Sequence, residues 1–137
     1  MTGNPRMRSR LAAAVAAVAT LHGALAWAAD FDGSKRLMCA PVQAMDCAVG
    51  EGCTSGLPAD VGAPAFMRID FRARTIVGPH RTTPILLVET TDAQLLLQGR
   101  KLGLAWSIAL DREDGRMSAT LVSRDAAIVL FGSCTPY

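Results

Sequence analysis

The chain has 137 residues, of which 14 are Lys or Arg and 12 are Asp or Glu, so its formal net charge is +2. Three of the basic residues lie among the first 28 residues, and without them 11 basic residues stand against 12 acidic ones, a net charge of −1. This balance lacks the basic excess with which proteins bind nucleic acids or anionic lipids, and the length suits one domain around one core.

The first 28 residues have the pattern of a signal peptide. Three arginines precede an apolar, alanine-rich run from Leu11 to Leu25, and Ala26-Trp27-Ala28 is a small-x-small cleavage motif. We therefore expect cleavage before Ala29, and a mature protein that is periplasmic or secreted and has no membrane segment. A retained membrane anchor is the alternative, because the apolar run approaches the length that crosses a bilayer.

The mature chain opens with residues 29–64, for which we expect short helical turns. Ser34 is a suitable helix N-cap and Pro41 cannot continue a helix, so one or two turns are expected over residues 35–40. A second short turn is expected over residues 42–47. Residues 48–64 contain four glycines and two prolines, a density that predicts an ordered loop.

Four cysteines follow the expected cleavage site: Cys39, Cys47, Cys53 and Cys134. An even number of cysteines in a small exported chain is typical of disulfides, and four cysteines allow three pairings. We favour Cys47 with Cys53, which closes a short loop around two glycines, and Cys39 with Cys134, which ties the N-terminal segment to the last strand. A zinc site is the alternative, although the spacings contain no Cys-x-x-Cys pair.

From residue 66 onward the chain has the pattern of an antiparallel β domain. Apolar and polar residues alternate from Leu104 to Asp111 and from Met117 to Ser123, and the Asp114-Gly115 pair between these runs is typical of a hairpin. Short connections make neighbouring strands antiparallel. We therefore predict a mainly β fold, an up-and-down meander of about seven strands forming a small barrel or half-barrel, in which residues 65–137 form one fold with residues 29–64. The expected strands are 66–71, 75–78, 82–90, 94–101, 104–111, 117–123 and 126–133.

Some of these strands are apolar at consecutive positions, and therefore on both faces. The runs are Ile85 to Val88, Leu95 to Leu97 and Ala126 to Phe131. A barrel alone in water would not expose such a wall, so we expect something to cover it. The three candidates are the segment 30–64, a second copy of the chain and a partner protein, and we favour the segment because the long disulfide would hold it there. We expect Trp106 and Phe131 in the core.

The sequence shows no catalytic or metal-binding motif. His80 is the one histidine of the mature chain, and no Gly-x-Ser-x-Gly elbow supplies a nucleophile for it. The run from Asp111 to Gly115 resembles a calcium loop only superficially, because the twelfth position is Val122 where a bidentate glutamate is required. We expect no catalytic residue, no metal and no cofactor.

The most distinctive polar run is Arg81-Thr82-Thr83-Pro84. In one interpretation it presents a guanidinium and two hydroxyls to an anionic or polar ligand at a barrel mouth. In the other, which we favour, it is the start of a strand with Pro84 at a sheet edge. His80, Arg81, Thr82 and Trp106 are therefore the weak candidates for ligand binding.

The chain resembles a family of small, uncharacterised exported (periplasmic) bacterial proteins. Four stretches carry the resemblance: Lys35 to Cys47, Phe66 to Phe71, Arg81 to Ile85 and Trp106 to Cys134. The resemblance covers most of the mature chain, including Ala63-Pro-Ala-Phe-Met-Arg-Ile-Asp70, and implies no active site. At the level of the fold, the mature chain is also similar to small periplasmic β-barrels tied by disulfides, which include lysozyme inhibitors and lipocalin-like carriers.

We therefore expect a non-enzymatic exported domain that binds a protein partner or a small apolar ligand. The alternatives are an accessory structural protein of the cell envelope and an enzyme of unrecognised type. A carrier predicts an interior cavity on the order of several hundred Å³ lined by aliphatic side chains. A filled interior beside an exposed apolar patch favours a partner-binding or structural role, and an enzyme predicts titratable groups that converge in a cleft.

Overall fold

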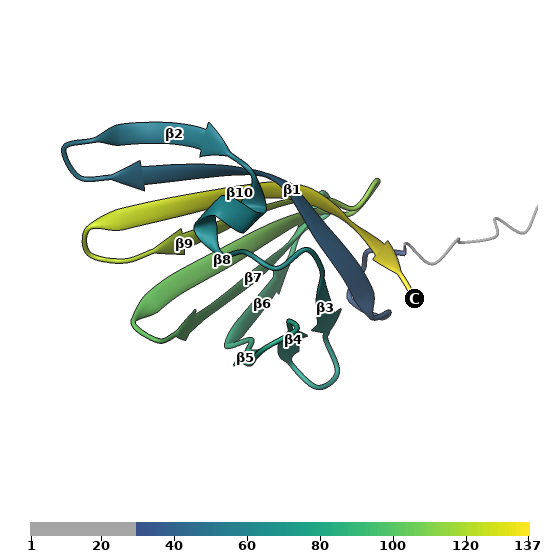
Figure 1. Cartoon of the computed structure of the whole chain (residues 1–137). Helices are drawn as coiled ribbons and strands as arrows, with labels where there is room; N and C mark the ends of the chain where they lie inside the picture. Colours follow the sequence, from purple (N-terminus) through teal and green to yellow (C-terminus); the bar gives the residue numbers. More distant parts are fainter. Residues whose placement is uncertain (1–29) are drawn as a thin grey trace, which may run out of the picture.

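The computed structural model describes residues 30–137, which form one antiparallel sheet that curves into a half-barrel (Figure 1). The expected signal peptide and its alternative, a membrane anchor, lie outside the described residues. Within the described part, no helix is long and apolar enough to cross a membrane.

Ten strands and one short 3-10 helix make up this part of the chain. They are β1 (Leu37–Ala48), β2 (Gly52–Gly56), η1 (Pro58–Val61), β3 (Met67–Asp70), β4 (Thr75–Val77), β5 (Thr82–Pro84), β6 (Leu87–Thr90), β7 (Gln94–Lys101), β8 (Leu104–Asp111), β9 (Arg116–Val122) and β10 (Ala126–Pro136). The order in the sheet is β5-β4-β3-β1-β10-β9-β8-β7-β6, and β2 pairs with β1 outside this path. The mainly β, antiparallel prediction is confirmed, with ten strands in place of about seven.

β1 was not expected from the sequence, and it holds the two parts of the sheet together. It pairs with β10 from Leu37 to Ala48, and its other edge pairs first with β3 and then with β2. The expected helical turns at residues 35–40 and 42–47 are therefore wrong, and β2 and η1 lie in the expected loop. Pairing on both edges outweighs the local helix signals, and Pro41 is tolerated beside a bulge that interrupts the ladder before Gln43.

The expected strand 82–90 is divided into β5 and β6, which lie at opposite ends of the sheet. The two residues between them bond to both ends: the Ile85 N–H donates to the Arg74 carbonyl and the Leu86 N–H donates to the Gln98 carbonyl, each at 2.9 Å. This short connection brings the two ends of the sheet toward each other.

The core lies on the inner face of the curved sheet. Leu37, Ile69, Leu95, Leu97 and Leu110 are fully buried there. Trp106 is also buried, as expected, whereas Phe131 is 41% exposed and the prediction of a core position for it is wrong. The alternation of a strand explains the difference: Leu130 points into the core, so its neighbour Phe131 points outward.

Both predicted disulfides are present, Cys39–Cys134 and Cys47–Cys53. Each joins two residues that lie directly opposite on paired strands, with Cα atoms 4.0 Å apart. Cys39 and Cys134 lie in the core, whereas Cys53 is exposed. The long disulfide therefore links β1 to β10 within the sheet and does not hold the segment 30–64 across the outside.

Candidate functional site

The candidate ligand residues from the sequence are not gathered into one site. His80 and Arg81 are exposed on the turn between β4 and β5, which is closed by a hydrogen bond of 2.9 Å from the Gly78 N–H to the Arg81 carbonyl. Thr82 begins β5 and pairs with Val77. Trp106 lies on β8 in the core.

Trp106 packs tightly between β8 and β7. It lies opposite Gly99, and a Cβ atom at Gly99 would overlap the Trp106 ring and lie 2.8 Å from the Pro84 carbonyl. The indole nitrogen is buried without a hydrogen-bond partner in the described structure. This position indicates a packing role for Trp106.

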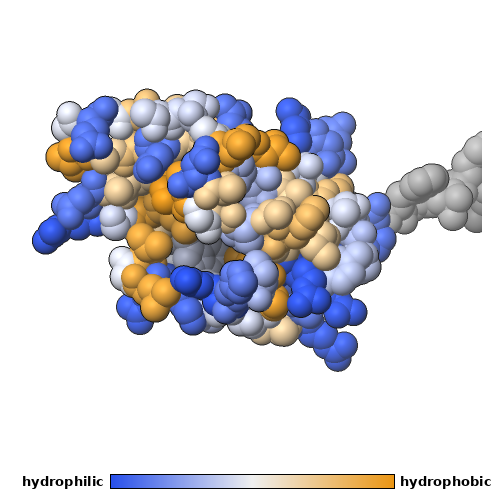
Figure 2. All heavy atoms as spheres, viewed as in Figure 1, coloured by the Kyte–Doolittle hydropathy of each residue, from blue (hydrophilic) through white to orange (hydrophobic). Residues whose placement is uncertain are grey.

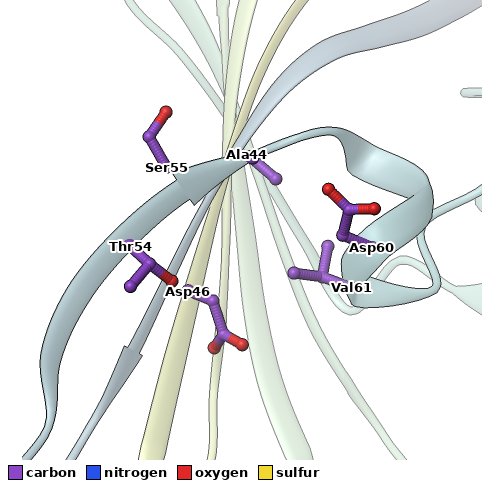
Figure 3. A pocket seen from close by; sticks show the side chains of 7 residues that line it. Ala44, Asp46, Thr54, Ser55, Asp60 and Val61 are labelled. Atoms are coloured by element: carbon purple, nitrogen blue, oxygen red, sulfur yellow. The ribbon is translucent and has the colours of Figure 1, made fainter.

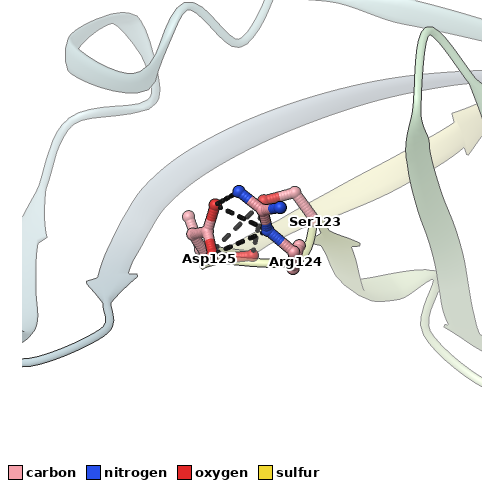
Figure 4. Close-up of polar contacts among 4 residues, drawn as sticks. Ser123, Arg124 and Asp125 are labelled. Atoms are coloured by element: carbon pink, nitrogen blue, oxygen red, sulfur yellow. Dashed lines mark hydrogen bonds and ion pairs between the residues drawn. The ribbon is translucent and has the colours of Figure 1, made fainter.

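The ionisable groups with shifted pKa values lie in exposed turns. The Ser34 hydrogen bonds lower the pKa of Asp32, and the backbone N–H of Arg116 lowers the pKa of Asp114. The Asp125 carboxylate raises the pKa of Arg124 in the turn between β9 and β10 (Figure 4). Local turn contacts explain all three shifts, and within residues 30–137 no three His, Cys, Asp or Glu residues are grouped as a metal site.

The surface of residues 30–137 includes two hollows. One, of about 130 Å³, lies between the β1–β2 hairpin and η1 (Figure 3). The other, of about 600 Å³, is lined only by Arg100 to Ala105, which form a single hairpin turn. It is therefore an open surface and not an interior cavity for an apolar ligand.

The most extensive feature is the outer face of the central strands, which we call the outer wall. Its side chains point away from the core in three registered rows. Two rows cross β1, β10, β9, β8 and β7, and the third crosses β1, β10, β9 and β8 and borders Arg100 on β7. None of them is charged. They are Gln43, Met45, Cys47, Leu96, Gln98, Ala105, Ser107, Ala109, Ser118, Thr120, Val122, Ala127, Val129 and Phe131.

Charged residues begin only at the border of the outer wall, for example at Arg100, Asp111 and Arg116. In its middle, the hydroxyls of Ser107 and Thr120 lie 2.7 Å apart and bond to each other. Several large apolar side chains are exposed on or beside the wall, among them Val122, Phe131 and Val42. Figure 2 shows the other face of the sheet, on which η1 lies, where hydrophobic residues gather across the middle and hydrophilic residues around the margin.

The sequence pointed to part of this surface. The run Ala126 to Phe131, apolar on both faces, signalled an apolar outside on β10. The expected cover, the segment 30–64, does not lie there, because its main element β1 is a strand of the sheet itself. Apart from Val122, the contributions of β8 and β9 are small or hydroxyl side chains, which gave no strong hydrophobic signal.

No family model, curated protein or solved structure matches this chain. The resemblance to small exported bacterial proteins therefore stays a prediction. The function is argued below from the geometry of the surface.

Proposed function

We propose that this protein is a non-enzymatic exported domain that binds a protein partner, and that the outer wall is its binding surface. One observation carries the proposal: two registered rows of outward side chains cross five strands, and a third crosses four, without a charged residue. The solvent face of an antiparallel sheet is ordinarily polar. A surface without charges is instead typical of the centre of a protein interface, from which charged residues are depleted.

The free-energy cost of removing water from this surface is low. Burying an unpaired charge is expensive, and a polar group that loses water without gaining a partner also costs free energy. Here the Ser107 and Thr120 hydroxyls already bond to each other. Arg100, Asp111 and Arg116 then form the kind of polar rim that surrounds protein interfaces.

A carrier of small apolar ligands is supported less well. The inner face of the sheet is occupied by packed side chains, including Leu95, Leu97, Trp106 and Ile108. The larger hollow is formed by one turn at the surface. A role as a structural protein of the cell envelope would use the same outer wall, with an envelope protein as the partner.

The proposal is tested by placing a charge in the middle of the outer wall. Thr120→Lys puts an ammonium group there, and the penalty for burying it should reduce binding roughly tenfold or more. Thr120→Val removes the same hydroxyl without adding charge, and Thr135→Lys adds the charge at an exposed position outside the wall. The measurement is retention of a protein from the exported fraction of the source organism on each immobilised variant.

We expect wild type and Thr135→Lys to retain the same protein and Thr120→Lys to lose it. Thr120→Val should retain it more weakly than wild type, because the Ser107 hydroxyl loses its partner. Equal retention by Thr120→Lys would refute the outer wall as the binding surface. Unfolding curves of the four proteins show whether any loss comes from unfolding, and gel filtration shows whether a second copy is the partner.

A further inference from the structure

The edge of the sheet at β2 is open. β2 pairs with β1 along one side and with no other strand in the described sheet, and its five residues are exposed. In Figure 1 it lies at the outer margin of the sheet, beyond β1. An unpaired strand edge presents backbone donors and acceptors to an incoming strand.

The distance between paired Cα atoms shows which backbone groups face outward. The Cys47 and Cys53 Cα atoms are 4.0 Å apart, close to the value of about 4.5 Å for a non-hydrogen-bonded antiparallel pair and far from about 5.5 Å for a hydrogen-bonded one. The N–H and C=O of Cys53 therefore point away from β1. Because the pattern repeats every second residue, those of Ser55 point the same way.

This edge lacks the features that protect strand edges. The sequence of β2, Gly-Cys-Thr-Ser-Gly, contains no lysine and no proline, and its register with β1 is unbroken. The disulfide to Cys47 holds the strand in its extended form. An incoming strand therefore meets an edge that is already ordered, which reduces the entropic cost of binding.

A side-chain hollow lies beside this edge. Thr54 and Asp46, which are paired across the hairpin, line it together with Asp60 and Val61 of η1. Ser55 also borders the hollow, with its hydroxyl directed away from Asp46 and Asp60 (Figure 3). One Asp60 oxygen accepts a hydrogen bond of 2.8 Å from the Leu57 N–H. The hollow therefore has an acidic residue from each of two elements and a hydroxyl from a third.

The charge around the hollow is negative. From Leu37 to Met67 the chain contains Asp46, Glu51 and Asp60 and no Lys, Arg or His. The adjacent β9–β10 turn, whose Asp125 carbonyl accepts the Val49 N–H at 3.1 Å, adds a mutually paired Arg124 and Asp125. A positively charged side chain complements this surface.

We propose that the free edge of β2 accepts an extended segment of a basic partner protein as an added strand, with a Lys or Arg side chain of that segment in the hollow between Asp46 and Asp60. Backbone hydrogen bonds to Cys53 and Ser55 align the segment, and the hollow selects the charge. This site is separate from the centre of the outer wall and goes beyond the function proposed above.

The test uses a synthetic nine-residue peptide of alternating threonine and valine, with lysine, glutamine or glutamate at its centre. Titration calorimetry on the full chain should show the lysine peptide binding about tenfold more tightly than the glutamine peptide, with the glutamate peptide weakest. The preference for lysine should fall at high salt, and in the variant with both Asp46→Asn and Asp60→Asn. Equal affinities of the three peptides would overturn the proposed charge selection.

Strand addition is tested by removing edge-facing donors. Ser55→Pro removes the N–H that faces the guest, whereas Ser55→Ala keeps it, so only the proline variant should lose the lysine peptide. A peptide N-methylated at alternate residues should lose binding to wild-type protein, which tests the same bond without altering the fold. If the peptide N-methylated at its odd residues and the peptide N-methylated at its even residues both still bind, strand addition is refuted. Thr120→Lys should leave peptide affinity unchanged, because Thr120 lies on the outer wall and not at the β2 edge.

Discussion

At the scale of single residues, glycines decide where backbones approach each other. Gly132 on β10 lies opposite Pro41, beside the bulge of β1. A Cβ atom at Gly132 would overlap the Ala40 carbonyl oxygen and lie 2.8 Å from the Pro41 Cα. Both are backbone atoms of a central strand, so they cannot move aside as the end of a flexible side chain would.

Gly132→Ala should therefore destabilise the protein by about 3 kcal/mol, the upper part of the range for overpacked sites. Gly78→Ala is the matched control, because a Cβ there would meet its nearest neighbour, the Arg81 carbonyl oxygen, at an ordinary 3.6 Å. It should change the free energy of unfolding by less than about 0.5 kcal/mol. Urea unfolding measures both, and equal midpoints would contradict the close approach of β1 and β10.

At the scale of elements, both disulfides join paired antiparallel strands, but they differ in the number of residues that separate the two cysteines. Cys39–Cys134 closes a separation of 95 residues between β1 and β10, and Cys47–Cys53 closes only 6 residues within one hairpin. The first lies in the core and the second is near the free edge. The long disulfide therefore restricts the unfolded chain far more than the short one.

Cys134→Ser should lower stability more than Cys53→Ser. Chain entropy alone gives about 4.7 kcal/mol for the long loop and about 2.2 kcal/mol for the short one. Thermal unfolding of the two variants beside wild type is the measurement. A melting temperature of Cys53→Ser at or below that of Cys134→Ser would show that another effect, such as loss of the ordered β2 edge, dominates.

At the scale of the whole molecule, the half-barrel is held by pairing between distant segments. β1 and β10, near the two ends of the described chain, are neighbours in the sheet and are linked by the long disulfide. All four cysteines are paired, and none of the cysteines in the described residues is free. Such pairing fits the export that we propose, because disulfides persist in oxidising compartments.

Protein collected from the exported fraction should therefore contain no reactive thiol. Labelling with a thiol reagent in denaturant without reductant, read by mass spectrometry, should add no label, whereas prior reduction should add four. The same chain produced in a reducing cytosol should label without prior reduction. Four labels on exported, unreduced protein would argue against an oxidised mature form.

The sequence alone determined the strands whose stability is local. The alternation in β8 and β9 and the Asp114-Gly115 turn located that hairpin, and of three possible cysteine pairings the sequence favoured the one that the structure shows. Only the tertiary structure decided the place of β1 and β2 and the division of residues 82–90, because those segments have weak or misleading local signals. β2 is rich in glycine, and β1 contains Pro41 beside a bulge.

The strength of the local sequence signal also explains why the outer wall could be predicted in part from the sequence and the hollow beside β2 could not. The apolar outer face of β10 comes from one run of consecutive apolar residues, so it could be predicted from the sequence as part of the outer wall. The hollow beside β2 needs Asp46 and Asp60 to meet across a hairpin and a 3-10 turn. Asp46 lies on β1 and Asp60 on η1, and the β1–β2 hairpin folds the chain back so that the two meet. The glycine-rich sequence of β2 has no strand pattern, so the sequence predicted a loop there and not this meeting.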